Sequence, residues 1–387
     1  MRVLVVAEYY PRAEDPVLGI WTHRQALAAR NAGAEVRVLV LHRPLPSLAA
    51  LRASDPDAII RPLRQPGTVE LDGLEVDYVR YLSPPRPWSY ASWGAWAAPL
   101  LGRALHRLRA RFPFDLVHAH YAVPAGDAVR RASPKAPLLV SVHGGDVYGP
   151  HATSPAVRST LACARLVLAN SCGTERRCRE HGARQTRVVH LGAEIPQAPP
   201  QRSESPTLVT VGHLVARKRH ADVISALALL KDRYPDLRYV IVGHGPERER
   251  LAALTLSLGL QRQVEFRGQL SPADAVAAAQ TAWLFVMPSV AEAFGVAYVE
   301  AMAGGVPAIG CQDEDGPAEI AAAGEGIVLV PARDPQALAQ RIASLLADPD
   351  GLAQLGRAAR ATVVTGFTWS RCGEETVQAY RNVLAPR

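Results

Sequence analysis

The chain has 387 residues, of which 48% are hydrophobic and 20% are charged, and its formal net charge is +7. This composition excludes a disordered chain, the length suits two domains, and the positive charge suits anionic partners. No run approaches the about 20 apolar residues of a membrane span, and the five scattered cysteines indicate neither a disulfide framework nor a zinc site.

The first half of the chain alternates short apolar runs with helical patterns. Its first run, residues 3–7, turns polar at Glu8 and is too short for a signal-peptide core, so we expect a cytoplasmic protein. Alternation of this kind predicts a parallel, doubly wound α/β sheet. Strands are expected at 3–7, 36–41, 116–119, 138–142, 166–169 and 188–190, and helices at 21–32 and 99–111.

The segment 84–96 is rich in proline and tryptophan, including Trp88, Trp93 and Trp96. The helix expected at 99–111 mixes leucines with four arginines. A basic amphipathic helix beside tryptophans predicts contact with an anionic membrane surface. The alternative is an ordinary helix that packs on the sheet and has a basic outer face.

Two further segments of this half place polar residues at strand ends. Residues 115–120 read D-L-V-H-A-H, and the period of a strand puts His118 and His120 on one face. A pair of histidines suggests a metal, but no acidic or cysteine partner is spaced to complete its shell. Residues 143–146 read H-G-G-D, and an Asp–His pair there could orient or deprotonate a hydroxyl.

Proline and small polar residues at 195–206 interrupt the pattern and predict a linker between two domains. We therefore expect domains at 1–194 and 207–366, followed by a C-terminal amphipathic helix within 367–387. The second half is expected to contain strands at 207–212, 239–243, 264–268, 283–287 and 308–310, and helices at 221–234 and 247–258.

The most informative stretch of the chain runs from Glu292 through a Phe-Gly break to Glu300, between two apolar strands. It follows a parallel strand, where open α/β sheets bind ligands. In one continuous helix the two carboxylates would be about 12 Å apart, at about 1.5 Å per residue. With Glu292 in the loop they could contact two parts of one phosphate-containing ligand, and the helix start offers N–H groups to its phosphates. The alternative is a helix cap and a solvated carboxylate.

Two other loops of this half suit a phosphate-containing ligand. Residues 212–219 read G-H-L-V-A-R-K-R, and fixed cations there would counter the negative charge of a leaving diphosphate. The alternative is a solvated basic turn. Residues 243–246 read G-H-G-P, and glycines let a backbone approach a ligand closely.

The segment 292–307, E-A-F-G-V-A-Y-V-E-A-M-A-G-G-V-P, resembles the E-x7-E signature of the retaining glycosyltransferases of group 1. The family usually has Gly where this chain has Ala293. The resemblance extends over nearly the whole chain. It implies the GT-B fold, in which two doubly wound Rossmann-like domains face each other across a cleft. The acceptor domain would come first and the donor domain second, and the C-terminal helix would cross back to the first domain.

The resemblance also implies roles in donor binding. Glu292 would contact hydroxyls of the donor sugar, Glu300 the ribose hydroxyls, and Lys218 the diphosphate. Further donor contacts are implied at Gly19, Gly212, His213, Arg217, Gly243, Gly245, Ala293, Phe294, Gly295 and Val296.

This sequence departs from the family pattern in the basic loop. His213 stands where the family has Arg, and Arg219 stands where it has Gly. Three residues are therefore alternatives for the missing cation: Arg217, Arg219 or a protonated His213.

In the first half, the resemblance implies that His120 faces the transferred sugar, while His118 is equally well explained as a core histidine. His143 and Asp146 would face the acceptor. The residues implied in catalysis are thus Glu292, Lys218, His120, His143 and Asp146.

The expected activity is retaining transfer of a hexose-type sugar from a UDP- or GDP-sugar to an acceptor hydroxyl, giving an α-linkage. The acceptor would be a glycan, a lipid-linked molecule or a small molecule, and the pathway cell-surface polysaccharide or glycolipid synthesis. The alternatives are glycosylation of a secondary metabolite, a sugar-nucleotide epimerase of the same fold, and a non-catalytic nucleotide-sugar binder. We expect no cofactor, no metal requirement and no nucleic-acid partner. The location would be cytoplasmic, with peripheral attachment to the inner face of the plasma membrane as an extension.

Overall fold

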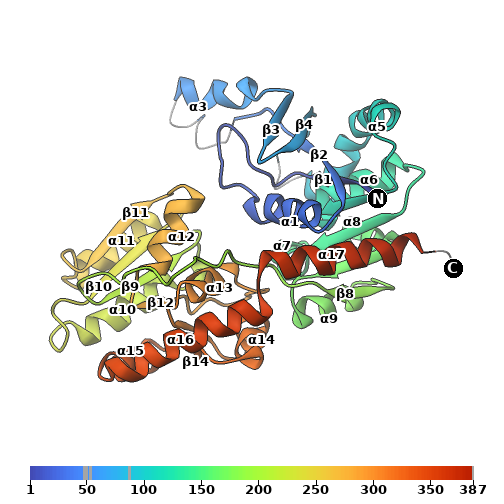
Figure 1. The fold of residues 1–387 in the computed structure, drawn as a ribbon. Coiled ribbons are helices and arrows are strands. Elements are labelled where there is room, and N and C mark those ends of the chain that lie inside the picture. Colours follow the sequence, from blue (N-terminus) through green and yellow to red (C-terminus); the bar gives the residue numbers. More distant parts are fainter. Residues whose placement is uncertain (47–50, 52–54, 86–88, 386–387) are drawn as a thin grey trace. The chain divides into compact units, whose positions relative to one another are not determined.

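The computed structural model describes residues 1–46, 51, 55–85 and 89–385, which form two compact units (Figure 1). The first unit runs from Met1 to His190 and resumes at Trp369, and the second is Leu191–Thr368. The segment expected as a linker, 195–206, groups with the second unit, where the indole N–H of Trp283 donates to the carbonyl oxygen of Ser203 at 2.9 Å. The boundary therefore falls four residues earlier than position 194.

The first unit is built on a sheet of eight described strands, in which one described pairing, β3 with β4, is antiparallel and the others are parallel. The strands are β1 (Arg2–Ala7), β2 (Glu35–His42), β3 (Thr68–Leu71), β4 (Leu74–Arg80), β5 (Leu116–His120), β6 (Leu138–Val142), β7 (Leu166–Ala169) and β8 (Thr186–Val188). Their order is β3-β4-β2-β1-β5-β6-β7-β8. The order reverses between β1 and β5, so the loops after these two strands border the switch point where such sheets bind ligands. The hairpin of β3 and β4 was not expected, and β8 lies two residues before the expected strand.

Helices cover this sheet, and the C-terminal helix is one of them. The helices are α1 (Ile20–Asn31), α3 (Pro56–Ile60), α5 (Trp93–Arg111), α6 (Asp127–Ala132), α7 (Gly144–Val147), α8 (Pro155–Cys163), α9 (Cys172–Glu180) and α17 (Trp369–Leu384). In Figure 1 the red helix α17 runs beside α1, and the two helices pack against each other. The phenol of Tyr380 on α17 is 2.7 Å from Nδ1 of His118 on β5, which fixes the helix to the sheet.

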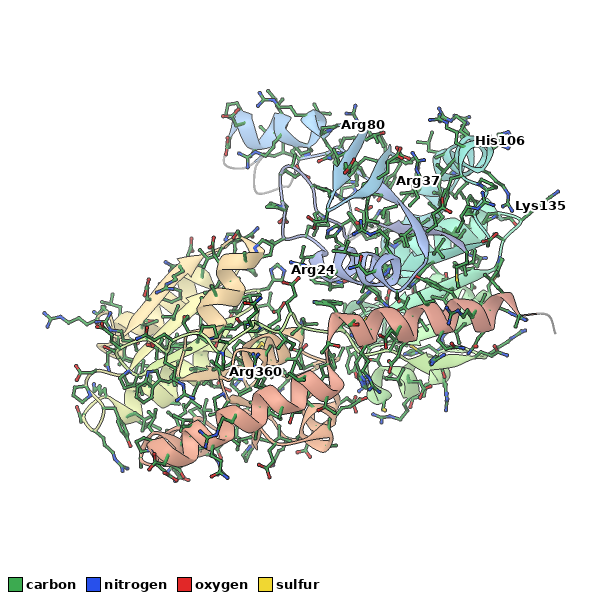
Figure 2. All side chains as sticks on the ribbon, in the orientation of Figure 1. Arg24, Arg37, Arg80, His106, Lys135 and Arg360 are labelled. Carbon is green, nitrogen blue, oxygen red and sulfur yellow. The ribbon has the colours of Figure 1, made fainter. Side chains whose placement is uncertain are left out.

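Helix α5 differs from the expected helix, because it begins at Trp93 and contains Pro99 in its interior. Leu101, Leu105 and Leu108 are buried in the core, so the arginines and His106 lie on the exposed side (Figure 2). This is the arrangement of a helix packed on the sheet, and its apolar face is not available to lipid. Trp88 lies outside the described residues. Within the described part of the chain, no helix has both the length and the apolar composition that a membrane crossing requires.

The second unit contains a six-stranded sheet in which every pairing is parallel. Its strands are β9 (Thr207–Val211), β10 (Arg238–Val242), β11 (Val264–Gly268), β12 (Leu284–Val286), β13 (Ala308–Cys311) and β14 (Ile327–Val330). The order β11-β10-β9-β12-β13-β14 reverses between β9 and β12. The loops after these two strands therefore border the switch point of this sheet.

The helices of the second unit form two groups. They are α10 (His220–Leu230), α11 (Arg248–Ser257), α12 (Pro272–Gln280), α13 (Val296–Ala303), α14 (Asp315–Ala323), α15 (Pro335–Leu346) and α16 (Pro349–Gly366). Helix α10 packs against α11 and α15, whereas α13 packs against α12 and α16. The hydrophobic core of this unit joins leucines and isoleucines of α10 and α15 to the strands.

Among the described helices, five start in the same way, with a capping Ser or Asp directly before a proline. The side chain of Ser271, for example, accepts a hydrogen bond from the backbone of Asp274, and Pro272 occupies the first helical position. Such a cap satisfies one free N–H group of the first turn, and proline lacks the N–H that would otherwise be unpaired. The other four capping residues are Asp55, Ser154, Asp334 and Asp348.

Candidate functional site

Two loops leave the second sheet on either side of its switch point, and they meet in a buried ion pair. Lys218 follows β9, Glu292 follows β12, and Lys218 Nζ lies 2.6 Å from Glu292 Oε2. The backbone N–H of Val290 also donates to the carbonyl oxygen of Arg217 at 2.8 Å, so the loops are tied together by main chain as well. The sequence predicted both side chains as site residues, and the fold places them side by side.

The surroundings of Glu292 keep its carboxylate charged. The hydroxyl of Ser289 donates to Oε2 at 2.7 Å, and a guanidinium nitrogen of Arg217 lies 3.5 Å away. Burial raises the pKa of Glu292, but the charges of Lys218 and Arg217 and the hydrogen bonds from Lys218 and Ser289 lower the pKa below its ordinary value. Burial lowers the pKa of Lys218, and the attraction of Glu292 opposes that shift. The pair is therefore a charged unit with little contact with water.

The structure separates the three alternatives for the missing cation. Arg219 makes two hydrogen bonds, of 2.8 and 2.7 Å, to the carboxylate of Asp222. His213 has an exposed side chain. Arg217 is the one of the three that reaches the carboxylate of Glu292, and about half of its side chain is exposed to solvent.

Helix α13 begins directly after this loop, and Gly295 makes the turn into it. Gly295 has φ of 91°, a left-handed conformation, and a Cβ there would lie 2.4 Å from the ring of Tyr298. A glycine is therefore required between the buried side chains of Ala293 and Phe294 and the helix start at Val296. The first N–H groups of a helix have no partner in the preceding turn and can bind an anion.

Glu300 lies about one turn into α13 and is half-buried. The amide of Gln280 donates to its backbone carbonyl at 3.0 Å, which fixes this part of the helix against α12. Glu292 and Glu300 thus stand on a loop and a helix of one strand–loop–helix unit, as the sequence predicted.

The glycines of the G-H-G-P segment serve the contact between two loops. A Cβ on Gly243 would lie 2.0 Å from the carbonyl oxygen of Gly212, and one on Gly245 would lie 2.4 Å from that of Leu214. The backbone at these two glycines was expected to approach a ligand closely. In the structure it approaches the loop after β9 closely. These glycines position the segment that carries Lys218.

In the first unit, His118 is a core histidine with both ring nitrogens satisfied. Nδ1 pairs with Tyr380 and Nε2 lies 2.7 Å from the hydroxyl of Ser141. His120 is also buried, and its Nδ1 lies 3.2 Å from Nε2 of His143. The other nitrogen of His120, Nε2, is buried and has no hydrogen-bond partner among the described residues. Burial lowers the pKa of His143 to about 3 and that of His120 well below its ordinary value, so these rings are neutral.

The expected side-chain pair between Asp146 and His143 is not formed. The Asp146 carboxylate accepts hydrogen bonds from the backbone N–H groups of Ala122 at 3.0 Å and His143 at 3.2 Å. Burial raises the pKa of Asp146 to about 7, and these backbone hydrogen bonds oppose the shift. Asp146 therefore joins the loop after β5 to the start of α7, and its contact with His143 is made through the backbone.

Several residues of these sites were not predicted. Tyr121 follows β5 with φ of 71°, and its ring lies 4.5 Å from those of Tyr9 and His143. Glu314 accepts a hydrogen bond of 2.9 Å from the backbone N–H of Glu292. The predicted Gly19 lies at the start of α1, and a Cβ on it would meet the carbonyl oxygen of Tyr9 at 2.1 Å. Across the residues that the structure describes, no three His, Cys, Asp or Glu side chains are grouped as a metal site requires.

The neutral state of buried His118 has a consequence for stability. Burial lowers its pKa to about 3, so at pH values between about 3 and 6.5 the unfolded chain binds a proton that the native chain does not. Lowering the pH through this range therefore favours unfolding. Relative to His118→Gln, the wild-type free energy of unfolding should fall by up to about 1.4 kcal/mol per pH unit below pH 6.5. Urea denaturation of both proteins at several pH values measures this difference, and a constant difference would contradict the prediction.

Known proteins resemble this chain in both halves. Residues 193–362 match the family model of glycosyl transferases group 1, and residues 19–193 match the glycosyl transferase 4-like domain. The 2-deoxystreptamine glucosyltransferase of Streptomyces kanamyceticus is 32% identical over 251 residues, which cover 55% of this chain and 63% of that protein. The alignment thus spans less than two thirds of this relative. The glycogen synthase of Mycobacterium tuberculosis is 26% identical over 409 residues, which cover 98% of this chain and 94% of that protein.

The fold also resembles solved structures. Anabaena HepE, solved in complex with UDP-glucose, superposes with a TM-score of 0.72 at 20% identity. The superposition covers 99% of this chain and all of that one. A likeness at this identity concerns the fold, which is that of two Rossmann-like α/β units.

Proposed function

Because the chain belongs to the group 1 glycosyltransferases, we propose that it transfers a hexose-type sugar from a nucleotide diphosphate sugar to an acceptor hydroxyl, with retention of configuration. The observation that supports this most directly is the buried ion pair of Lys218 and Glu292, with half-exposed Arg217 beside it, at the switch point of the second sheet. Fixed charges in a water-poor site stabilise charge that develops in a transition state.

The second unit would bind the donor. As the bond to the sugar breaks, negative charge grows on the diphosphate, and Lys218, Arg217 and the N–H groups at the start of α13 would stabilise it. Glu292 would accept hydrogen bonds from hydroxyls of the transferred sugar, and Glu300 from those of the ribose. We propose that these side chains suffice without a metal ion. UDP-glucose in the related HepE structure supports a nucleotide sugar as donor.

The first unit would bind the acceptor and provide the polar groups around it. The unpaired Nε2 of neutral His120 could exchange a hydrogen bond or a proton with a sugar or acceptor hydroxyl. His143 would support His120 through their 3.2 Å contact. Asp146 would act indirectly, by fixing the backbone of His143.

The acceptor would belong to cell-surface polysaccharide or glycolipid synthesis. A relative named glycogen synthase that aligns with 98% of the chain supports a polymer. The name 2-deoxystreptamine glucosyltransferase supports a small-molecule acceptor as the second candidate. We propose a cytoplasmic enzyme that reaches a membrane-linked acceptor through the basic outer face of α5, and sedimentation with anionic or neutral vesicles tests this. Equal sedimentation with both would exclude attachment by charge.

Product analysis tests the proposed reaction. A thermal-shift screen of nucleoside diphosphates first identifies the base, and the matching sugar nucleotides are then incubated with glycan, lipid-linked and small-molecule acceptors. An α-linked product, identified from its anomeric NMR signal, is expected. A β-linked product would contradict retention, an isomerised donor would indicate an epimerase, and binding without turnover would indicate a non-catalytic binder.

A further inference from the structure

We propose that a basic pocket beside the amino-terminal ends of strands in the first sheet binds a ligand that carries phosphate groups. The pocket is a cavity of about 580 Å³. Its walls include Pro137, Ala164 and Gln185, residues that precede strands β6, β7 and β8. His120 and His143 lie at the carboxyl ends of β5 and β6, so the pocket and these two histidines are at opposite ends of the strands. A cavity of this size suits a small molecule.

The charge of the pocket walls is entirely positive. Arg130, Arg165 and Arg184 line the cavity, and none of its described lining residues is an aspartate or glutamate. Arg130 is paired with buried Asp127 at 2.6 Å, but its Nε is buried and has no hydrogen-bond partner among the described residues. A buried donor without an acceptor is costly, so Arg130 is a wall residue whose hydrogen-bonding capacity the described chain does not fully satisfy.

Arg165 and Arg184 add two charges that the rest of the described chain does not neutralise by an ion pair. Arg184 also lines an adjoining cavity of about 550 Å³, whose described walls again contain arginines and no carboxylate. Guanidinium groups bind phosphate oxygens in pairs of parallel hydrogen bonds and are weakly hydrated. Two arginines without an ion-pair partner beside a third in one cavity therefore suit a phosphorylated small molecule or the phosphate of a lipid headgroup.

The arginines could instead serve the fold alone. Helices α6 and α8 end at this pocket, and a basic side chain near a helix C-terminus stabilises it by about 0.3–1 kcal/mol. Arg130 and Arg165 are near these helix ends, but Arg184 precedes β8 and is exposed. Arg184 is therefore the residue that distinguishes ligand binding from helix capping.

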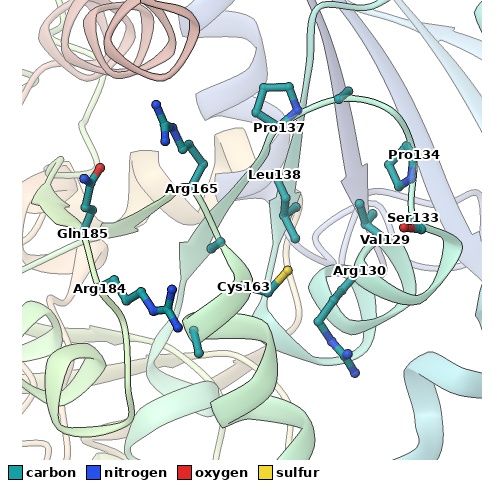
Figure 3. A pocket seen from close by; sticks show the side chains of 13 residues that line it. Val129, Arg130, Ser133, Pro134, Pro137, Leu138, Cys163, Arg165, Arg184 and Gln185 are labelled. Carbon is teal, nitrogen blue, oxygen red and sulfur yellow. The ribbon is translucent and has the colours of Figure 1, made fainter. Parts of the chain in front are cut away.

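Cys163 lies in the wall of this pocket, so its reactivity can be used to measure whether the pocket is occupied. It is an exposed, free cysteine in the wall, and Figure 3 shows the side chains of Arg130 and Arg184 on either side of it. Cys172 is also exposed and outside any disulfide but does not line the pocket, whereas Cys178, Cys311 and Cys372 are buried. Alkylation of Cys163 by iodoacetamide, quantified by mass spectrometry, reports occupancy of the pocket, and Cys172 is the control within the same molecule.

The experiment compares alkylation with and without inorganic pyrophosphate. At a concentration about ten times its Kd, pyrophosphate leaves the pocket open about a tenth of the time, so the rate at Cys163 should fall about tenfold while that at Cys172 does not change. In the double variant Arg165→Ala/Arg184→Ala, pyrophosphate should no longer protect Cys163 from alkylation. Protection should persist in Arg238→Ala/Arg262→Ala, which removes two exposed arginines of the second unit, and in Lys218→Met, which alters the proposed donor site.

Vesicles with phosphatidylglycerol, compared with phosphatidylcholine vesicles, form the second arm. Protection by pyrophosphate indicates a soluble phosphorylated ligand, and protection by the anionic vesicles alone indicates a lipid headgroup. Unchanged alkylation of Cys163 in both arms would overturn the proposal. So would equal protection in wild type and Arg165→Ala/Arg184→Ala, with circular dichroism confirming that the variant is folded. The readout needs no sugar transfer and does not depend on the proposed reaction.

Discussion

Replacing Lys218 by methionine should lower kcat/KM for sugar transfer about a hundred- to a thousandfold. Methionine retains much of the side-chain length but cannot provide the charge that Lys218 Nζ places 2.6 Å from Glu292. The proposed diphosphate would then leave without its nearest cation. Steady-state kinetics with the donor identified by thermal shift measures the loss, and near-normal kcat/KM would exclude Lys218 from the site.

The same substitution also affects stability, and the two effects must be separated. Removing one partner of a buried ion pair costs about 3–5 kcal/mol, because the remaining charge is left in the interior. Glu292 would retain the hydrogen bond from the hydroxyl of Ser289 and the half-exposed guanidinium of Arg217 at 3.5 Å. Assays therefore belong well below the unfolding temperature of Lys218→Met, with circular dichroism on the same sample.

Two neighbouring arginines provide matched charge-removal controls for this prediction. Arg217→Met should lose activity on the order of tenfold, because a half-exposed charge 3.5 Å from Glu292 is screened by water. Arg219→Met should lower thermal stability by leaving the buried carboxylate of Asp222 without its ion-pair partner, but it should change kcat/KM by no more than about twofold. A larger kinetic loss in Arg219→Met than in Arg217→Met would reverse our assignment of the second cation.

Local sequence patterns predicted most strands of both sheets and the loops at the switch point of each sheet. Some of the elements that were missed also had a local signal in the sequence. The hairpin of β3 and β4 turns at Asp72 and Gly73, which have φ of 47° and 74°, and Asp-Gly between alternating residues is a strong hairpin signal. The Ser-Pro and Asp-Pro pairs at the helix starts were equally clear signals of helix N-termini in the sequence. Asp222 stands three residues after Arg219 at the start of a helix, a spacing that allows their ion pair.

Other contacts had no signal in the sequence, because they join residues that only the fold brings together. Tyr380 and His118 are 262 positions apart, and nothing near either residue indicates the other. The same holds for Glu314, which fixes the backbone of Glu292 from a loop after β13. Asp146 shows a further limit: the motif indicated a polar residue near His143, but not that its carboxylate would bond to backbone N–H groups.

Replacing Glu292 by glutamine should separate two roles that the geometry allows. The carboxylate could contact the donor sugar, as the family resemblance implies, or it could serve only to hold Lys218 in place, as their 2.6 Å contact allows. Glutamine has nearly the same shape and no charge. We expect transfer to fall by at least about a hundredfold, since a sugar hydroxyl would lose a charged acceptor in the transition state.

Binding of the nucleoside diphosphate without its sugar should not weaken in Glu292→Gln, in contrast to sugar transfer. Glu292 is ionised, because Lys218 and Arg217 lower its pKa against the effect of burial. Its negative charge therefore repels a diphosphate near Lys218. Removing that charge should leave the affinity for the nucleoside diphosphate unchanged or tighter, even as transfer falls. Calorimetric titration of wild type and Glu292→Gln measures both affinities.

The two roles differ most clearly in how the ligand stabilises the variant. Glu292→Gln leaves the Lys218 ammonium buried without its carboxylate, at a cost of about 3–5 kcal/mol, and a bound diphosphate would replace that missing counter-charge. The rise in Tm on adding nucleoside diphosphate should therefore be larger in Glu292→Gln than in wild type. Ser289→Ala is the control, because it removes a hydrogen bond to Glu292 and no charge. If Glu292 served only to position Lys218, Glu292→Gln would instead bind the nucleoside diphosphate more weakly and show a smaller rise in Tm.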